Sequence, residues 1–182
     1  MATVHDTTLV PSKLELLAEW LPQQPWYRGT GTPHLAKAGG FRLDDPAGEV
    51  GIEFMVVTDT ASQGVAGYLV PMTYRGTEFD APLIGTTEHG VLGTRFIYDG
   101  PGDPVLRAEL TALVRGAAEP QAQSASDTPD PTVRVGLLPD ASGIEILRIL
   151  TTSDAAREPG EVSVPWRLPD GRQVRGVVTR TA

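Results

Sequence analysis

Two neighbouring aromatic residues beside a glycine-rich loop are the first candidates for chemistry. Trp26 and Tyr27 precede the stretch RGTGTPHLAKAGG, which carries Arg28 and Lys37. Aromatic rings offer flat apolar faces on which a sugar ring or a peptide can stack, and cations beside glycines can bind an anion or a phosphorylated sugar. Large aromatic side chains are more often buried in the core, however. The loop lacks the glycine spacing of known phosphate-binding motifs, so a ligand site at these four residues stands as an alternative to a structural role.

The other reactive residue types form no catalytic pattern. The chain has no cysteine, which excludes disulfides, thiolate catalysis and cysteine-bound metal. His5, His34 and His89 lack the spacing of metal ligands, and only His89, between a glutamate and a glycine, merits a test. No serine lies in a Gly-x-Ser-x-Gly turn, and the aspartates at 44–45 and Asp103 fit turn and helix-cap roles better than a catalytic pair. We therefore expect no catalytic residue, no metal and no cofactor.

Composition and charge narrow the possible partners. The 182 residues carry a net charge of -8, and most of the acidic excess lies in residues 1–115. An acidic surface repels phosphate backbones, so we expect no nucleic-acid partner. No apolar run approaches the roughly 18–20 residues of a membrane span, and the first residues have neither the basic start nor the apolar core of a secretory signal. A cytoplasmic protein without a membrane partner is the expectation, and the sequence does not indicate an oligomeric state.

The elements that must position these residues can be inferred from local patterns. Residues 12–21 indicate an amphipathic helix that begins at a capping box of Ser12 and Glu15. Residues 49–58 alternate as a strand with one wholly apolar face and one mixed face, which we expect to be half-solvated. Pro71 cannot donate to a sheet ladder, so its strand should lie at an edge or carry a bulge.

The second half of the chain begins with the clearest helix. Asp103 is the expected N-cap and Gly116 the expected C-terminal cap, with a stripe of leucines between them. Residues 116–131 are poor in apolar side chains and indicate a linker. Residues 132–182 indicate strands, including a hairpin with a three-residue loop at 169–171. That register places Trp166 opposite Val174.

Together these elements predict an α+β protein in which an antiparallel sheet is packed by two helices on one side. We expect an α+β domain at 1–115, a linker at 116–131 and a small all-β appendage at 132–182. About 50 residues are close to the lower limit for independent folding, so the appendage should pack on the first domain or on a partner. If it leaves Trp166 exposed, the indole would mark an interface.

Several segments, in order, resemble a known family. The stretches LLAEWLPQQPWYRGTG, VGIEFMVVTD, GYLVPMTYRG and RFIYDGPGDPVLRAELTALV are similar to the N-terminal cap domain of bacterial maltokinases, which phosphorylate maltose on the trehalose-to-glycogen route. The Tyr-Asp…Asp-Pro helix start of that family matches Tyr98, Asp99, Asp103 and Pro104. The resemblance covers about residues 3–115. It implies a cystatin-like arrangement, with a helix laid across an antiparallel sheet.

The resemblance does not carry the kinase activity with it. In the family, the cap precedes a two-lobed kinase-like body of several hundred residues, for which this sequence has no room. Kinase-like phosphoryl transfer also needs a phosphate-binding lysine and an Asp-and-Asn catalytic loop, and the sequence contains no asparagine. We therefore expect a non-catalytic interaction or regulatory module that partners an enzyme of trehalose, maltose or glycogen metabolism. The alternative is a small module that binds a sugar or phosphosugar through Trp26, Tyr27 and Arg28.

Overall fold

A computed structural model describes residues 9–61, 64–124, 127–153 and 158–182. In chain order the elements are β1 (Leu9–Val10), α1 (Lys13–Trp20), η1 (Leu21–Gln23), β2 (Leu35–Leu43), β3 (Gly51–Asp59), β4 (Ala66–Arg75), β5 (Leu83–His89), β6 (Gly93–Asp99), η2 (Gly100–Gly102), α2 (Pro104–Arg115), β7 (Arg134–Val135), β8 (Ile144–Ile146), β9 (Ile149–Leu150), β10 (Val162–Arg167) and β11 (Gln173–Thr181).

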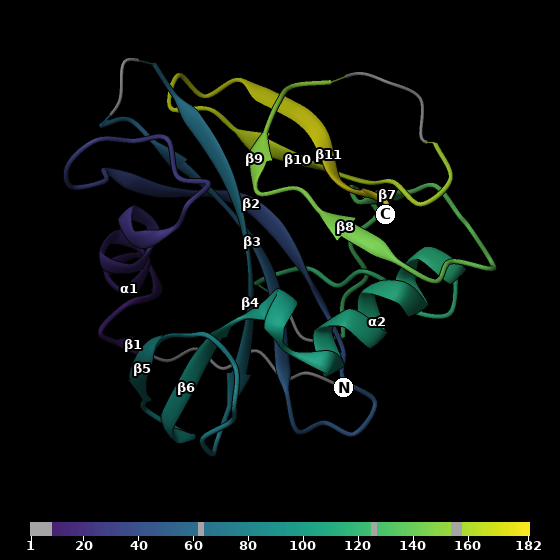
Figure 1. Ribbon diagram of the computed structural model, residues 1–182, viewed down its shortest axis with the longest axis horizontal. Helices are drawn as coiled ribbons and strands as arrows, with labels where there is room; N and C mark the ends of the chain where they lie inside the picture. The colour runs from purple at the N-terminus through teal and green to yellow at the C-terminus, as the bar shows by residue number, and fades with distance from the viewer. Residues whose placement is uncertain (1–8, 62–63, 125–126, 154–157) are drawn as a thin grey trace.

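All described strands join one antiparallel sheet in the order β1-β5-β6-β4-β3-β2-β10-β11-β8, with β7 on β10 and β9 on β4. The sheet and its two helices confirm the predicted α+β class. The helices, however, lie on opposite faces of the β2–β3–β4 region, as Figure 1 shows. The one-sided packing that we predicted is therefore wrong, and the cystatin-like comparison stays a prediction.

The alternation of β3 explains why both faces are covered. Phe54 and Val56 belong to the cluster that contains the leucines of α2, whereas Met55 and Val57 belong to the cluster that contains α1. Every residue of β3 after Gly51 is buried. The face that we expected to be half-solvated is instead enclosed by α1 and the aromatic residues that follow it.

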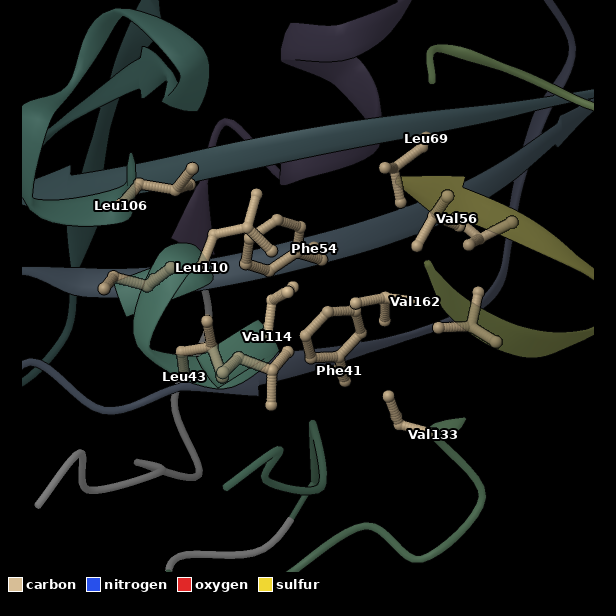
Figure 2. Close-up of a cluster of buried hydrophobic side chains, with 14 of the residues drawn as sticks. Phe41, Leu43, Phe54, Val56, Leu69, Leu106, Leu110, Val114, Val133 and Val162 are labelled. Carbon is tan, nitrogen blue, oxygen red and sulfur yellow. The ribbon is translucent and has the colours of Figure 1, made fainter. Parts of the chain in front are cut away.

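The larger core lies between the sheet and α2. The rings of Phe41 and Phe54 stack with centroids 4.6 Å apart and planes within 1° of parallel. Figure 2 shows these rings beside Leu110 and Val114 of α2, with Val162 of the C-terminal hairpin closing the other side. Residues from both halves of the chain thus share one apolar cluster, whose burial is the main stabilising contribution.

Local capping follows the sequence prediction. Ser12 and Glu15 form the reciprocal capping box of α1. Asp103 caps α2 by accepting a hydrogen bond from the Val105 N–H, and Gly116 ends the helix in a left-handed conformation at φ 79°. These contacts satisfy backbone groups that a helix end leaves without partners.

Pro71 lies inside the sheet rather than at an edge. It pairs with Phe54 of β3 in a ladder without a register shift, so the prediction of an edge strand or a bulge is wrong. The N–H of Leu69, two residues earlier, points away from β3 and donates to the Arg148 carbonyl. The backbone nitrogen of Pro71 points to the same side of β4, because alternate residues of a strand share their orientation. On that side β9 pairs up to residue 68 and β6 pairs from residue 72 onward. The missing N–H therefore falls in the gap between two partner strands.

The C-terminal hairpin extends the same sheet. Its loop is the predicted three-residue turn, with Gly171 at φ 87°, and Trp166 faces Val174. A bulge after Val162 shifts the next pair, so Val162 faces Thr179 instead of the Val178 that an unbulged ladder would place there. β10 then pairs with β2 at Trp166 and Gly39. The proposed division into domains at 115 and 132 stays a prediction.

Candidate functional site

The predicted aromatic pair lies in a cluster at the α1 face of the sheet. The Trp26 ring is 5.9 Å from the rings of both Trp20 and Tyr68, and the Arg148 guanidinium lies 5.0 Å from its centroid. The Tyr27 ring lies 5.5 Å from Tyr68. Protein side chains therefore contact Trp26 from several directions. These contacts favour a structural role for the pair, while sugar stacking stays a prediction.

Asp59 anchors the loop that follows Trp26 and Tyr27 through hydrogen bonds. Its carboxylate, fully buried at the end of β3, accepts hydrogen bonds from the Tyr27 hydroxyl at 2.7 Å and from the His34 N–H at 2.9 Å. Burial, followed by the bond to Asp59, raises the pKa of Tyr27. Arg28 contributes its backbone N–H to the Tyr68 hydroxyl, and its side chain is exposed. The glycine-rich loop is thus tied to the sheet by a buried carboxylate.

A second buried carboxylate, Glu53, was not singled out by the sequence reasoning. It lies on the α1 face of β3 and accepts hydrogen bonds from Lys13 at 2.7 Å, Tyr74 at 2.5 Å and Gln123 at 2.8 Å. Burial acts to raise the pKa of Glu53, but Lys13, Tyr74 and Lys37 together outweigh it, so that pKa lies below its ordinary value. The available signal was that Glu53 is the one charged residue within the otherwise apolar stretch 50–57.

Lys37 is not in the loop where we placed it. It lies in β2, with its ammonium 3.9 Å from Glu53 and its side chain 44% exposed. Burial lowers the pKa of Lys37, with Glu53 opposing that effect. The structure therefore places Lys37 in the sheet, beside the Glu53 cluster.

In the Tyr-Asp…Asp-Pro motif, the side chains of Tyr98, Asp99 and Asp103 form hydrogen bonds with other parts of the fold. Asp99 accepts a 2.6 Å hydrogen bond from Arg148, and Asp103 accepts two from Arg75 at 2.8 and 2.9 Å. The Tyr98 hydroxyl accepts from the Phe79 N–H at 2.7 Å. Each side chain thus joins β6 or the start of α2 to another part of the fold. The geometry gives these carboxylates a scaffolding role.

His89 organises the turn between β5 and β6. Its Nδ1 accepts hydrogen bonds from the N–H groups of Val91 at 3.2 Å and Leu92 at 3.1 Å. The two apolar residues are 64% and 44% exposed. Val10, 64% exposed, pairs opposite Glu88 at the same end of β5. We call Val10, Val91 and Leu92 the apolar tip.

The interface predicted at Trp166 is not supported by its position. The side chain is 3% exposed and belongs to the core. A Cβ on Gly39 would lie 3.3 Å from its Cβ, and one on Gly176 would lie 2.8 Å from its ring. Trp166 therefore packs against the first part of the chain, because glycines on β2 and β11 leave room for the indole.

The structure places no three His, Asp or Glu residues where they could share a metal ion, among the residues that it describes. His5 lies outside the described residues. Neither of the two α-helices in the described ranges has the length and apolar character needed to cross a membrane.

The fold and these contacts define a small α+β scaffold whose motif residues are engaged in structural interactions. Residues 20–103 match the family model of the maltokinase N-terminal cap domain. This part of the chain is therefore similar to a maltokinase N-terminal cap domain, which confirms the resemblance over these residues. The match begins at the last residue of α1 and ends at the N-cap of α2. No curated protein matches the chain.

Proposed function

We propose that this protein is a non-catalytic, maltokinase-cap-like module that docks onto an enzyme of trehalose, maltose or glycogen metabolism in the cytoplasm. The cap match over residues 20–103 supports the link to that family, in which the cap precedes the catalytic body. Asp99 and Asp103, which match the family's Tyr-Asp…Asp-Pro motif, connect β6 and the start of α2 to Arg148 and Arg75. Such a scaffold supports binding rather than bond-breaking chemistry.

The apolar tip is the observation that carries the proposal. Trp166, which would mark an interface if it were exposed, is instead buried in the core, and the apolar stripe of α1 is also used in the core, where Leu17 is buried. Val91 and Leu92 instead remain exposed at the end of the β5–β6 hairpin, far from the C-terminal hairpin (Figure 1). His89 holds their backbone in a defined turn. Exposed neighbouring apolar side chains on an ordered turn are typical of an interface.

A binding experiment with a maltokinase tests this function. A maltokinase lacking its own N-terminal cap should bind the purified chain in isothermal titration calorimetry. Replacing both Val91 and Leu92 with serine should weaken the complex by about tenfold or more, because a buried aliphatic side chain contributes about 1.5–3 kcal/mol. Val65→Ser is the matched control, since Val65 is 49% exposed and lies outside the apolar tip.

Two results would contradict the proposal. One is the absence of binding to the capless kinase at concentrations where its own cap binds. The other is equal weakening by the Val65 control and by the tip variant. Turnover of ATP by the purified chain with maltose would separately contradict the non-catalytic part.

A further inference from the structure

A groove opens where β2 and β10 separate. The two strands pair only at Gly39 and Trp166, where a Cβ on Gly39 would lie 2.7 Å from the Pro165 carbonyl oxygen. Beyond this point β2 bulges between Lys37 and Gly39. The resulting space has a volume of about 450 Å³, which falls within the range of small-ligand sites.

The groove wall is basic although the chain as a whole is acidic. Three basic residues line it: His34, just before β2, Lys37, within β2, and Arg167, at the end of β10. Buried Thr58 and exposed Thr60 also line the space, and none of the described lining residues is an aspartate or glutamate. The net charge of -8 makes such a local cation group a departure from the average surface.

The cations of this groove are available for a ligand. The Arg167 side chain forms no ion pair or hydrogen bond with any part of the chain that the structure describes, although its backbone pairs with Gln173 of β11. Lys37 is held loosely, because its 3.9 Å separation from Glu53 exceeds hydrogen-bond distance. Glu53 already accepts three other hydrogen bonds. Asp59, at the end of the neighbouring β3, is likewise satisfied by its own donors.

From this arrangement we propose that the groove binds a small ligand carrying one phosphate group on a polar body, with Arg167 and Lys37 as its main cationic contacts. Arginine forms paired hydrogen bonds with phosphate oxygens, and lysine contributes a mobile positive charge. The exposed side chains of Thr60 and His34 supply further hydrogen-bonding groups. The acidic remainder of the surface disfavours long polyanions such as nucleic acid. This proposal does not depend on docking at the apolar tip, because it concerns the isolated chain.

An NMR titration of the isolated ¹⁵N-labelled chain tests the proposal. The probes are inorganic phosphate, glucose 6-phosphate and glucose, at constant ionic strength. Both phosphates should produce saturable amide shifts concentrated at residues 34–37, 58–60 and 167–168, with glucose 6-phosphate binding more tightly. Glucose should produce no comparable shifts.

Matched variants locate the contact. Arg167→Gln should weaken glucose 6-phosphate binding about tenfold or more, the expected loss for a charge-assisted contact, and Lys37→Gln should weaken it less. Arg180→Gln is the control on the same hairpin, since Arg180 pairs with Glu145 at the far end. Unchanged affinity in Arg167→Gln would overturn the proposal. So would non-saturating shifts spread over exposed basic residues, which would show an adventitious ion only.

Discussion

Arg75 binds the carboxylate of Asp103 with two nitrogens, Nε at 2.8 Å from Oδ2 and Nη2 at 2.9 Å from Oδ1. The same carboxylate accepts the Val105 N–H at 2.9 Å and is fully buried. One side chain therefore caps α2 and joins it to β4. The Arg75 guanidinium also lies 4.1 Å from the centre of the Phe79 ring.

Breaking this pair should destabilise the protein strongly. Arg75→Met leaves Asp103 buried without its cation, which costs about 3–5 kcal/mol of unfolding free energy. Arg180→Met removes one partner of the exposed pair with Glu145 and should cost no more than about 1 kcal/mol. Urea unfolding of both variants measures the difference. Equal losses would mean that Asp103 is not held as the structure indicates.

Acid should destabilise the protein partly through Asp103. Burial acts to raise the pKa of this carboxyl, but the hydrogen bonds from Arg75 and Val105 outweigh burial and place that pKa below the ordinary value. A carboxyl with a lower pKa in the folded state stabilises the fold above its unfolded pKa, and that stability is lost as pH falls through the folded pKa. Unfolding free energy should therefore drop below about pH 4. Asp103→Asn should flatten this dependence when urea unfolding is repeated across pH, whereas an unchanged slope would contradict it.

The two lysines near Glu53, Lys13 and Lys37, should contribute unequally to the stability of the folded protein. Lys13 donates to the carboxylate at 2.7 Å, whereas Lys37 lies 3.9 Å away. Lys13→Met should cost about 1.5–3 kcal/mol, the range for a hydrogen bond to a charged group. Lys37→Met should cost less than about 1 kcal/mol. Thermal or urea unfolding separates the two, and a larger loss for Lys37 would reverse the assignment.

The Tyr27 hydroxyl should stabilise the loop that it anchors. Tyr27→Phe removes the donor to buried Asp59 and should cost about 1–3 kcal/mol. Hydrogen exchange should then quicken at the amides of His34 and Ala61, whose N–H groups share that carboxylate. Unaltered exchange at both amides would show that the loop is held independently of Tyr27.

Trp166 should behave as a core residue. Trp166→Ala removes a side chain that is 3% exposed and should cost about 3–5 kcal/mol. Leu137→Ala, at a residue 59% exposed, serves as the surface comparison and should change stability by less than about 0.5 kcal/mol. Denaturant unfolding provides both values. A loss near the surface value for Trp166 would restore the interface interpretation.

Local features were predictable from the sequence because each depends on residues a few positions apart. The capping box of Ser12 and Glu15, the cap at Asp103 and the turn at Gly171 all formed as predicted. The pairing of Trp166 with Val174 also followed from the turn. The edge-strand prediction for the strand of residue 71 failed, because it depended on which distant strands would lie alongside. The burial of the indole depended on distant strands in the same way.

The candidate sites show the same division. The sequence marked Trp26, Tyr27 and Lys37 as noteworthy but placed Lys37 in a loop and did not identify Asp59 as the partner of Tyr27. It missed Glu53, whose partners Lys13 and Gln123 lie 40 and 70 positions away. No local pattern links residues at such separations.

By itself the sequence determined the α+β class, the helix ends, the hairpin turn and the resemblance to the maltokinase cap, because capping, alternation and turn chemistry act over short stretches of chain. Only the tertiary structure decided that the two helices cover opposite faces, that Trp166 is buried, and that Lys37 and Arg167 line one groove. Those outcomes depend on how distant strands pair, and strand pairing is set by the packing of the whole sheet.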